Sequence, residues 1–172
     1  MLYFNYIYMK NLPENIQIKF YQLLEKETSI EDFELFLYEN NKLLEEKLEQ
    51  NDYFQILSFN YNKKDSIYEF EELLKSIMGI DDFYKWKIIK LSESIVSKKI
   101  DMLIGLNKLC DIYYKTEGKF VPKYILGYQD DLQDIPKKDK YHLYHSDFLK
   151  TELEGLEEFK EDIVNSLIEL ID

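Results

Sequence analysis

The chain has 172 residues, 45% of them hydrophobic and 33% charged, and its formal net charge at pH 7 is −12. The length favours one domain, 16% aromatic residues are too many for a disordered chain, and a single cysteine excludes a disulfide-stapled secreted fold. The acidic balance argues against direct nucleic-acid binding, because basic groups must neutralise phosphates, and no apolar run is long enough for a membrane span.

The first nine residues, Met1–Met9, are apolar and aromatic, which raises the possibility of a signal peptide. The stretch lacks a basic start, Asn5 interrupts it, and no small-residue cleavage site follows. We therefore expect a strand or helical turn packed against the core. The expected location is the cytoplasm, where reducing conditions suit the lone thiol of Cys110.

Helical spacing organises the first half of the chain. Residues 11–14 (Asn-Leu-Pro-Glu) have the features of a helix start, and apolar residues then recur at intervals of three and four. A second helix begins after Ser29, whose side chain is a suitable N-cap. The clearest helix opens at residues 65–66 and ends at Gly79. The segment 51–59 is ambiguous, because its aromatic residues also suit a strand.

The second half is predicted to be helical over residues 81–95, about 100–114 and about 149–171, with a long irregular connection at 117–140. β alternation is clear in no segment. The predicted fold is therefore all-α: a single-domain multi-helix bundle over residues 1–172 with at most one small β element. The residues expected to be largely buried are Leu73, Leu74, Trp86, Leu103, Leu106, Leu156, Ile163 and Leu167.

Side chains that could carry chemistry are few. His142 and His145 share a helical face near Asp147, but a catalytic zinc site needs three protein ligands and structural sites usually need four. Cys110 lies on an apolar stripe, where a cysteine usually acts as a small hydrophobic residue. No nucleotide-binding or nucleophile-elbow motif occurs among the five glycines. We expect no catalytic residue, no cofactor and no metal.

Negative charge gathers toward both ends of the chain, around a mildly basic centre at residues 81–128. Acidic runs are often no more than solvated faces that keep a protein soluble. The alternative is a docking surface for a basic protein partner, to which interface-prone tyrosines would contribute. The candidate partner-binding residues are Asp130, Asp131, Asp134, Tyr124, Tyr128, Tyr141 and Tyr144 around the connection, and Glu154, Glu157, Glu158 and Glu161 on the last helix.

Three stretches together resemble a known class of protein. They are residues 33–38 (FELFLY) with a Leu/Glu-rich stretch at 43–48, residues 52–61 (DYFQILSFNY), and the helix that contains residues 72–74 (ELL). Their order resembles small acidic bacterial immunity proteins of contact-dependent growth inhibition and other polymorphic toxin systems, best over residues 30–78.

The resemblance implies a cytoplasmic toxin inhibitor that neutralises one cognate toxin domain by stoichiometric protein–protein interaction. Such families share no binding residues, so the resemblance assigns none. A nuclease toxin would suit the acidity, because nuclease clefts are basic in order to hold phosphate backbones. Two alternatives stay open: a protein-interaction or regulatory module unrelated to toxins, and a small enzyme with an unrecognised site.

Overall fold

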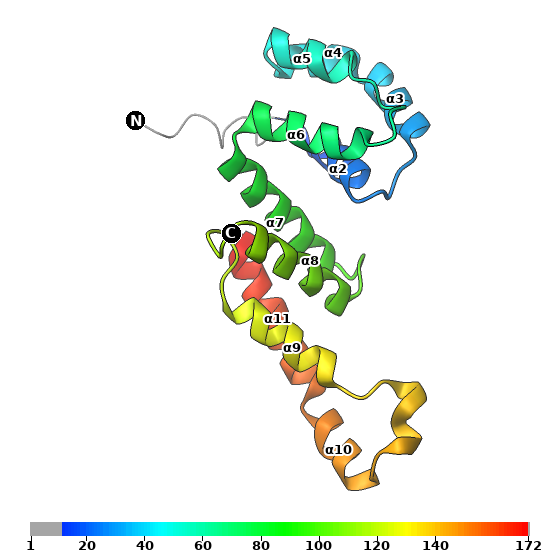
Figure 1. The fold of residues 1–172 in the computed structure, drawn as a ribbon, viewed down its shortest axis with the longest axis vertical. Helices are drawn as coiled ribbons and strands as arrows, with labels where there is room; N and C mark the ends of the chain where they lie inside the picture. Colours follow the sequence, from blue (N-terminus) through cyan, green and yellow to red (C-terminus); the bar gives the residue numbers. More distant parts are fainter. Residues whose placement is uncertain (1–11, 172) are drawn as a thin grey trace. The chain divides into compact units, whose positions relative to one another are not determined.

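The structure is a computed structural model that describes residues 12–171 (Figure 1). These residues form ten α-helices and one 3₁₀ helix and contain no strand, which confirms the all-α prediction. Contacts divide the chain into two compact units, Met1–Lys87 and Ile88–Asp172, with the boundary inside helix α7. The single-domain organisation stays a prediction, and the prediction for Met1–Met9 lies outside the described residues. Every described helix is too short or too polar to cross a bilayer.

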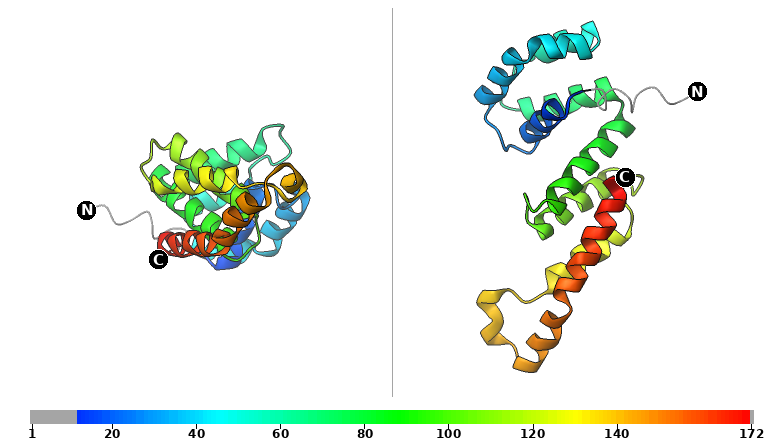
Figure 2. Two further views of the ribbon diagram at one scale, coloured as in Figure 1. Left: turned by 90° about the horizontal axis from the view of Figure 1, so that it is seen from below. Right: turned by 180° about the vertical axis from the view of Figure 1, so that it is seen from behind.

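Each unit consists of successive helices joined by short segments (Figures 1 and 2). Unit 1 contains α2 (Glu14–Leu24), α3 (Ile30–Glu39), α4 (Asn41–Lys47), α5 (Gln50–Leu57), α6 (Ser66–Met78) and the first part of α7 (Ile80–Val96). Unit 2 contains the rest of α7, α8 (Met102–Lys115), α9 (Tyr124–Asp134), the 3₁₀ helix η1 (Lys138–Leu143), α10 (Ser146–Glu154) and α11 (Leu156–Ile171). Helix α2 packs against α3 and α6 in unit 1, and α8 packs against α9 in unit 2.

Local sequence signals account for several helix ends. The Ser29 hydroxyl accepts a hydrogen bond from the Asp32 amide at 3.0 Å, so the predicted N-cap of α3 is confirmed. Gly79 follows α6 with a φ of 83°, a conformation that a residue with a Cβ rarely adopts. The strand alternative for residues 51–59 is wrong, because α5 occupies most of this segment and buries Ile56.

A cluster of aromatic rings forms the core of unit 1. The Phe70 ring of α6 lies within 5.8 Å, centre to centre, of the rings of Phe20, Phe33, Phe59 and Tyr61. The contacts are edge-to-face, the arrangement that aromatic quadrupoles favour. The Tyr61 hydroxyl donates a hydrogen bond to the Ile56 carbonyl at 2.8 Å, so its polar end is satisfied. The cluster joins α2, α3, α6 and the segment after α5.

A network of charged side chains lies beside this core and joins α6 to α7. Glu71 forms ion pairs with Lys75 at 2.9 Å and with Lys87 at 3.0 Å, and Lys87 lies 3.6 Å from Glu25, the residue directly after α2. Burial works against the charged form of Glu71, but the two ammonium groups outweigh it and hold the pKa of the carboxyl below its ordinary value. Ionised Glu71 therefore stabilises unit 1.

The Glu71→Gln variant is expected to lower the free energy of unfolding of unit 1 by about 1–2 kcal/mol at pH 7, because two lysines lose a charged acceptor. Because folding lowers the pKa of Glu71, its stabilisation is present above the ordinary pKa and disappears as the pH falls through the folded-state value. Urea unfolding at several pH values should therefore show the difference from wild type shrinking below about pH 4.5.

The matched control for this prediction is Glu72→Gln. Glu72 also pairs with Lys75, at 2.8 Å, but its side chain is 49% exposed, so the cost should stay below about 1 kcal/mol. Equal losses in the two variants at every pH would contradict the role assigned to Glu71.

Two predictions for unit 2 are wrong in detail. The expected irregular connection at 117–140 contains α9, because Ile125, Tyr128 and Leu132 recur at helical spacing. The single last helix expected from Leu149 is instead α10 and α11, separated at Gly155. Glycine is a weak helix former, which explains the interruption at that residue.

The predicted core is confirmed at five positions and wrong at three. The buried residues are Leu74, Trp86, Leu106, Ile163 and Leu167. Leu73, Leu103 and Leu156 are only half-buried. Leu73 borders a surface pocket next to Phe59, and Leu156 borders another at the start of α11. Helical spacing therefore identifies most of the buried positions but not how completely each one is covered.

Substitution of glycine by alanine is expected to have opposite effects at two positions of unit 2. A Cβ at Gly105 of α8 would collide with the side chain of Ile95, whereas a Cβ at Gly127 of α9 would meet nothing within 4 Å. Gly105→Ala should therefore destabilise unit 2 by about 1–3 kcal/mol through overpacking. Gly127→Ala should stabilise it by about 0.5–1 kcal/mol, because alanine is the better helix former.

Thermal unfolding followed by far-ultraviolet circular dichroism measures both glycine substitutions. An unchanged or raised stability of Gly105→Ala would show that the close packing of α8 against Ile95 is not maintained in solution, and a loss of stability in Gly127→Ala would contradict the prediction for α9.

Candidate partner-binding surface

Helix α9 directs one row of predicted binding residues toward α11. Tyr124, Tyr128 and Asp131 follow one another at intervals of four and three, so they share a face. The Tyr128 ring lies 5.7 Å from Phe159, and its hydroxyl is 3.0 Å from the Ser166 hydroxyl. Tyr128 therefore holds α9 against α11, and its half-buried ring is less available to a partner than expected.

Tyr124 extends this row and stays accessible. Its side chain is 43% exposed, and its ring lies 5.7 Å from the ring of Tyr128. Partial burial, together with the negative charge of Glu169, raises the pKa of its hydroxyl. The uncharged phenol is thus a hydrogen-bonding group at the edge of the α9–α11 contact.

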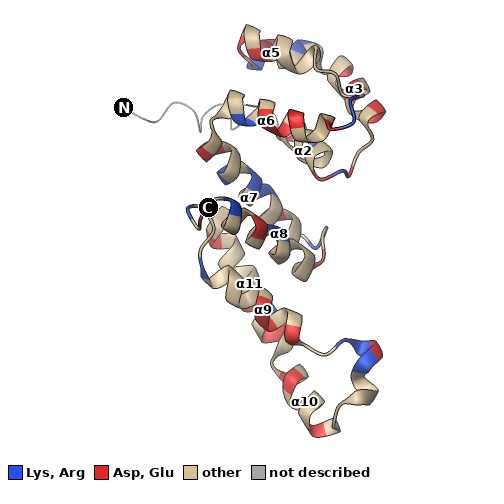
Figure 3. Cartoon of the chain, in the orientation of Figure 1, with Lys and Arg blue, Asp and Glu red and all other residues tan. Residues whose placement is uncertain are grey.

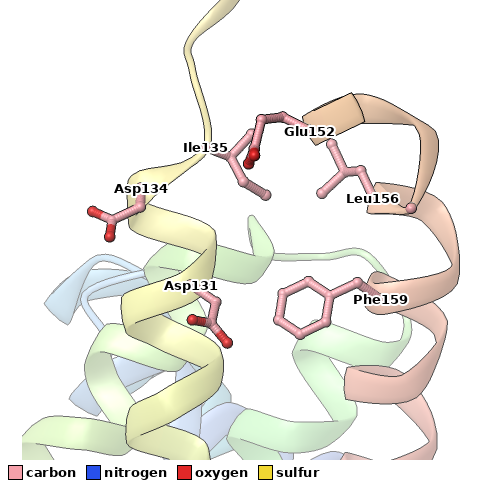
Figure 4. Close-up of a pocket in the computed structure, with 7 residues that line it drawn as sticks. Asp131, Asp134, Ile135, Glu152, Leu156 and Phe159 are labelled. Carbon is pink, nitrogen blue, oxygen red and sulfur yellow. The ribbon is translucent and has the colours of Figure 1, made fainter. Parts of the chain in front are cut away.

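A pocket opens where the end of α9 faces α10 and α11 (Figure 4). Its volume is about 340 Å³, and its lining residues are Asp131, Asp134, Ile135, Glu152, Gly155, Leu156 and Phe159. The Asp131 carboxylate faces the ring of Phe159, Glu152 projects into the gap between Ile135 and Leu156, and Asp134 points away from it. The pocket therefore combines three apolar side chains with carboxylates from two helices.

The carboxylates of this pocket have no cation of their own. Asp131, Asp134 and Glu152 are exposed, and none forms an ion pair with any residue of 12–171. Asp130 points elsewhere on α9. Its charge acts on Cys110 of α8, whose pKa is raised first by burial and then by Asp130.

Helices α10 and α11 carry further acidic residues (Figure 3). Glu154, Glu157, Glu158 and Glu161 are all exposed. Two of them are partly neutralised within their own helices, Glu154 by Lys150 at 3.6 Å and Glu157 by Lys160 at 2.8 Å. The hydrogen bond and charge of Lys160 lower the pKa of Glu157.

The remaining candidates lie in a separate part of unit 2, around η1. Tyr141 is half-buried in η1, and Tyr144 is 41% exposed and stacks on Phe148 at 5.7 Å. Neither lines the pocket. His142 and His145 are exposed, and within residues 12–171 no group of three His, Cys, Asp or Glu side chains is placed to hold a metal ion.

The structure thus joins the two acidic runs that the sequence presents separately. The pocket brings Asp131 of α9 together with Glu152 of α10. Glu152, Leu156 and Phe159 are not among the predicted binding residues. The helical spacing of Tyr124, Tyr128 and Asp131 indicates that Asp131 lies on the same face as the two tyrosines. The position of Glu152 near Asp131, in contrast, depends on the break between α10 and α11 at Gly155. Searches of protein-family models, curated proteins and solved structures found no match to this chain.

Proposed function

We propose that this chain is an immunity protein that binds a cognate bacterial toxin domain in the cytoplasm and neutralises it by stoichiometric protein–protein inhibition. The toxin domain is basic, as the cleft of a nuclease would be. The resemblance of residues 30–78 to immunity proteins supports the class of protein, and the charge of unit 2 supports the nature of the partner.

The observation that carries the proposal is the exposed acidic surface of α9, α10 and α11. Residues 139–172 contain ten acidic residues and three lysines, and most of these carboxylates are exposed. A surface of one sign attracts a partner of opposite charge from beyond contact distance and raises the association rate. Carboxylates at this surface would also occupy the positions that substrate phosphates take in a nuclease cleft.

The neighbouring gene provides the test, because an immunity gene usually lies directly after the gene of its toxin. The toxin domain encoded there should form a one-to-one complex with this chain and lose its activity in proportion to the chain added. An unrelated basic protein of similar charge is the control, because it should form no stable complex at physiological ionic strength.

Two results would contradict this proposal. One is the absence of a complex with the neighbouring toxin domain, and the other is a complex in which the toxin keeps its full activity. A neighbouring gene for a regulator or structural protein, with which the chain forms a complex, would favour the alternative of an interaction module unrelated to toxins.

A further inference from the structure

The pocket between α9 and α10–α11 has a chemistry that selects one kind of side chain. One part of its wall is apolar and consists of the ring of Phe159 and the aliphatic side chains of Ile135 and Leu156. The carboxylates of Asp131 and Glu152 extend into it from opposite helices. An occupant therefore needs an apolar stem, a positive charge at its end, and donors that reach two separate acceptors.

We infer that this pocket receives an arginine side chain of the basic protein partner. The inference rests on the proposed function, and it names the group that the partner inserts. A guanidinium group is planar and weakly hydrated, so one face stacks on the Phe159 ring while its edges donate hydrogen bonds to Asp131 and Glu152. The methylene stem contacts Ile135 and Leu156.

Charge complementarity and the apolar walls together select this occupant. A free metal ion would gain nothing from Phe159 or Leu156, and an apolar side chain would leave the carboxylates beside it without a cation. Lysine carries the charge, but its ammonium is compact and strongly hydrated and has no planar face to stack on the Phe159 ring. No lysine among residues 12–171 forms an ion pair with Asp131 or Glu152, so the position is open to a partner.

The test uses the full chain, labelled for nuclear magnetic resonance, and the capped tripeptide acetyl-Gly-Arg-Gly-amide. Titration should shift the signals of the residues that line the pocket, with Gly155 and Phe159 among them. The same peptide with citrulline, which has the shape of arginine without its charge, should leave these signals unchanged. The lysine peptide should bind more weakly than the arginine peptide.

Two double variants of equal net charge distinguish specific binding in the pocket from a general attraction of the basic peptide to the acidic protein. Asp131→Asn with Glu152→Gln should weaken binding of the arginine peptide about tenfold or more, because two charge-assisted hydrogen bonds are lost. Asp130→Asn with Glu158→Gln is the matched control, since neither side chain lines the pocket. Its affinity should stay within about twofold of wild type.

Phe159→Leu keeps an apolar wall and removes the ring, so it should weaken binding of the arginine peptide while leaving the fold visible in the same spectra. Equal shifts with the citrulline peptide, or equal losses in the two double variants, would overturn the inference. An equal affinity for the lysine peptide would overturn the choice of arginine.

The inference and the proposed function can fail separately. If the neighbouring toxin domain binds and is inhibited but the arginine peptide does not occupy the pocket, only the inference fails. If the arginine peptide binds in the pocket as expected and no toxin domain is bound, the inference about the pocket is supported and the proposed function fails.

Discussion

Replacing Phe70 with alanine is expected to lower the free energy of unfolding of unit 1 by about 3–5 kcal/mol. The Phe70 side chain is completely buried, and four other aromatic rings surround it at centre-to-centre distances of 5.5–5.8 Å. These rings come from several elements and pack against one another. We therefore expect them not to shift enough to fill the space that alanine leaves. The loss therefore combines the transfer of the ring to water with an unfilled cavity.

Urea unfolding followed by the fluorescence of Trp86, the single tryptophan of the chain, measures this loss, because Trp86 belongs to unit 1 and is buried there. Phe70→Leu should cost less than alanine, since it keeps much of the apolar volume. Phe54→Ala is the control at the surface: this ring is 56% exposed, and its removal should change stability by less than about 0.5 kcal/mol. A loss below about 1 kcal/mol for Phe70→Ala would show that the ring cluster is not the core.

Reversing Asp130, Asp131 and Asp134 to lysine should slow association with the cognate toxin domain about tenfold or more at low salt. Each substitution changes the charge by two, so the net charge moves from −12 to −6 without altering a buried side chain. Electrostatic attraction is screened over about 8–10 Å at physiological salt, so the variant should also lose most of the salt dependence of its association rate. Folding should be little affected, because exposed charges contribute about 1 kcal/mol or less each.

Association rates at two salt concentrations measure this effect. Reversal of Glu154, Glu157, Glu158 and Glu161 tests the α10–α11 side of the same surface, and we expect the smaller effect there because Lys150 and Lys160 already neutralise two of these carboxylates. Reversal of Glu27, Glu45 and Glu46 in unit 1 is the control with the same change in charge as the aspartate triple. Unchanged rates in both unit 2 variants would contradict docking on the acidic surface.

Local sequence determined most of the helices of this protein. The Ser29 cap, the glycine after α6 and the three-to-four spacing of Phe20, Leu23 and Leu24 depend on residues within one or two turns. Such signals act through nearby backbone groups and a single apolar stripe, so they can be recognised in the sequence before the fold is known. Predictions failed where two local signals competed, as at 51–59, where aromatic content suggested a strand and packing of Ile56 favours a helix.

The position of the acidic side chains was decided by tertiary structure. Asp131 and Glu152 are 21 positions apart, and whether they meet depends on the packing of α9 against α11 through Tyr128 and on the break between α10 and α11 at Gly155. Periodicity indicates which side of each helix is apolar but carries no information on which two helices come together, or on their register. The pocket beside Phe159 exists because packing between distant parts of the chain sets the register of α9 against α11. The sequence therefore shows which carboxylates are present, whereas only the tertiary structure brings Asp131 and Glu152 to the same pocket.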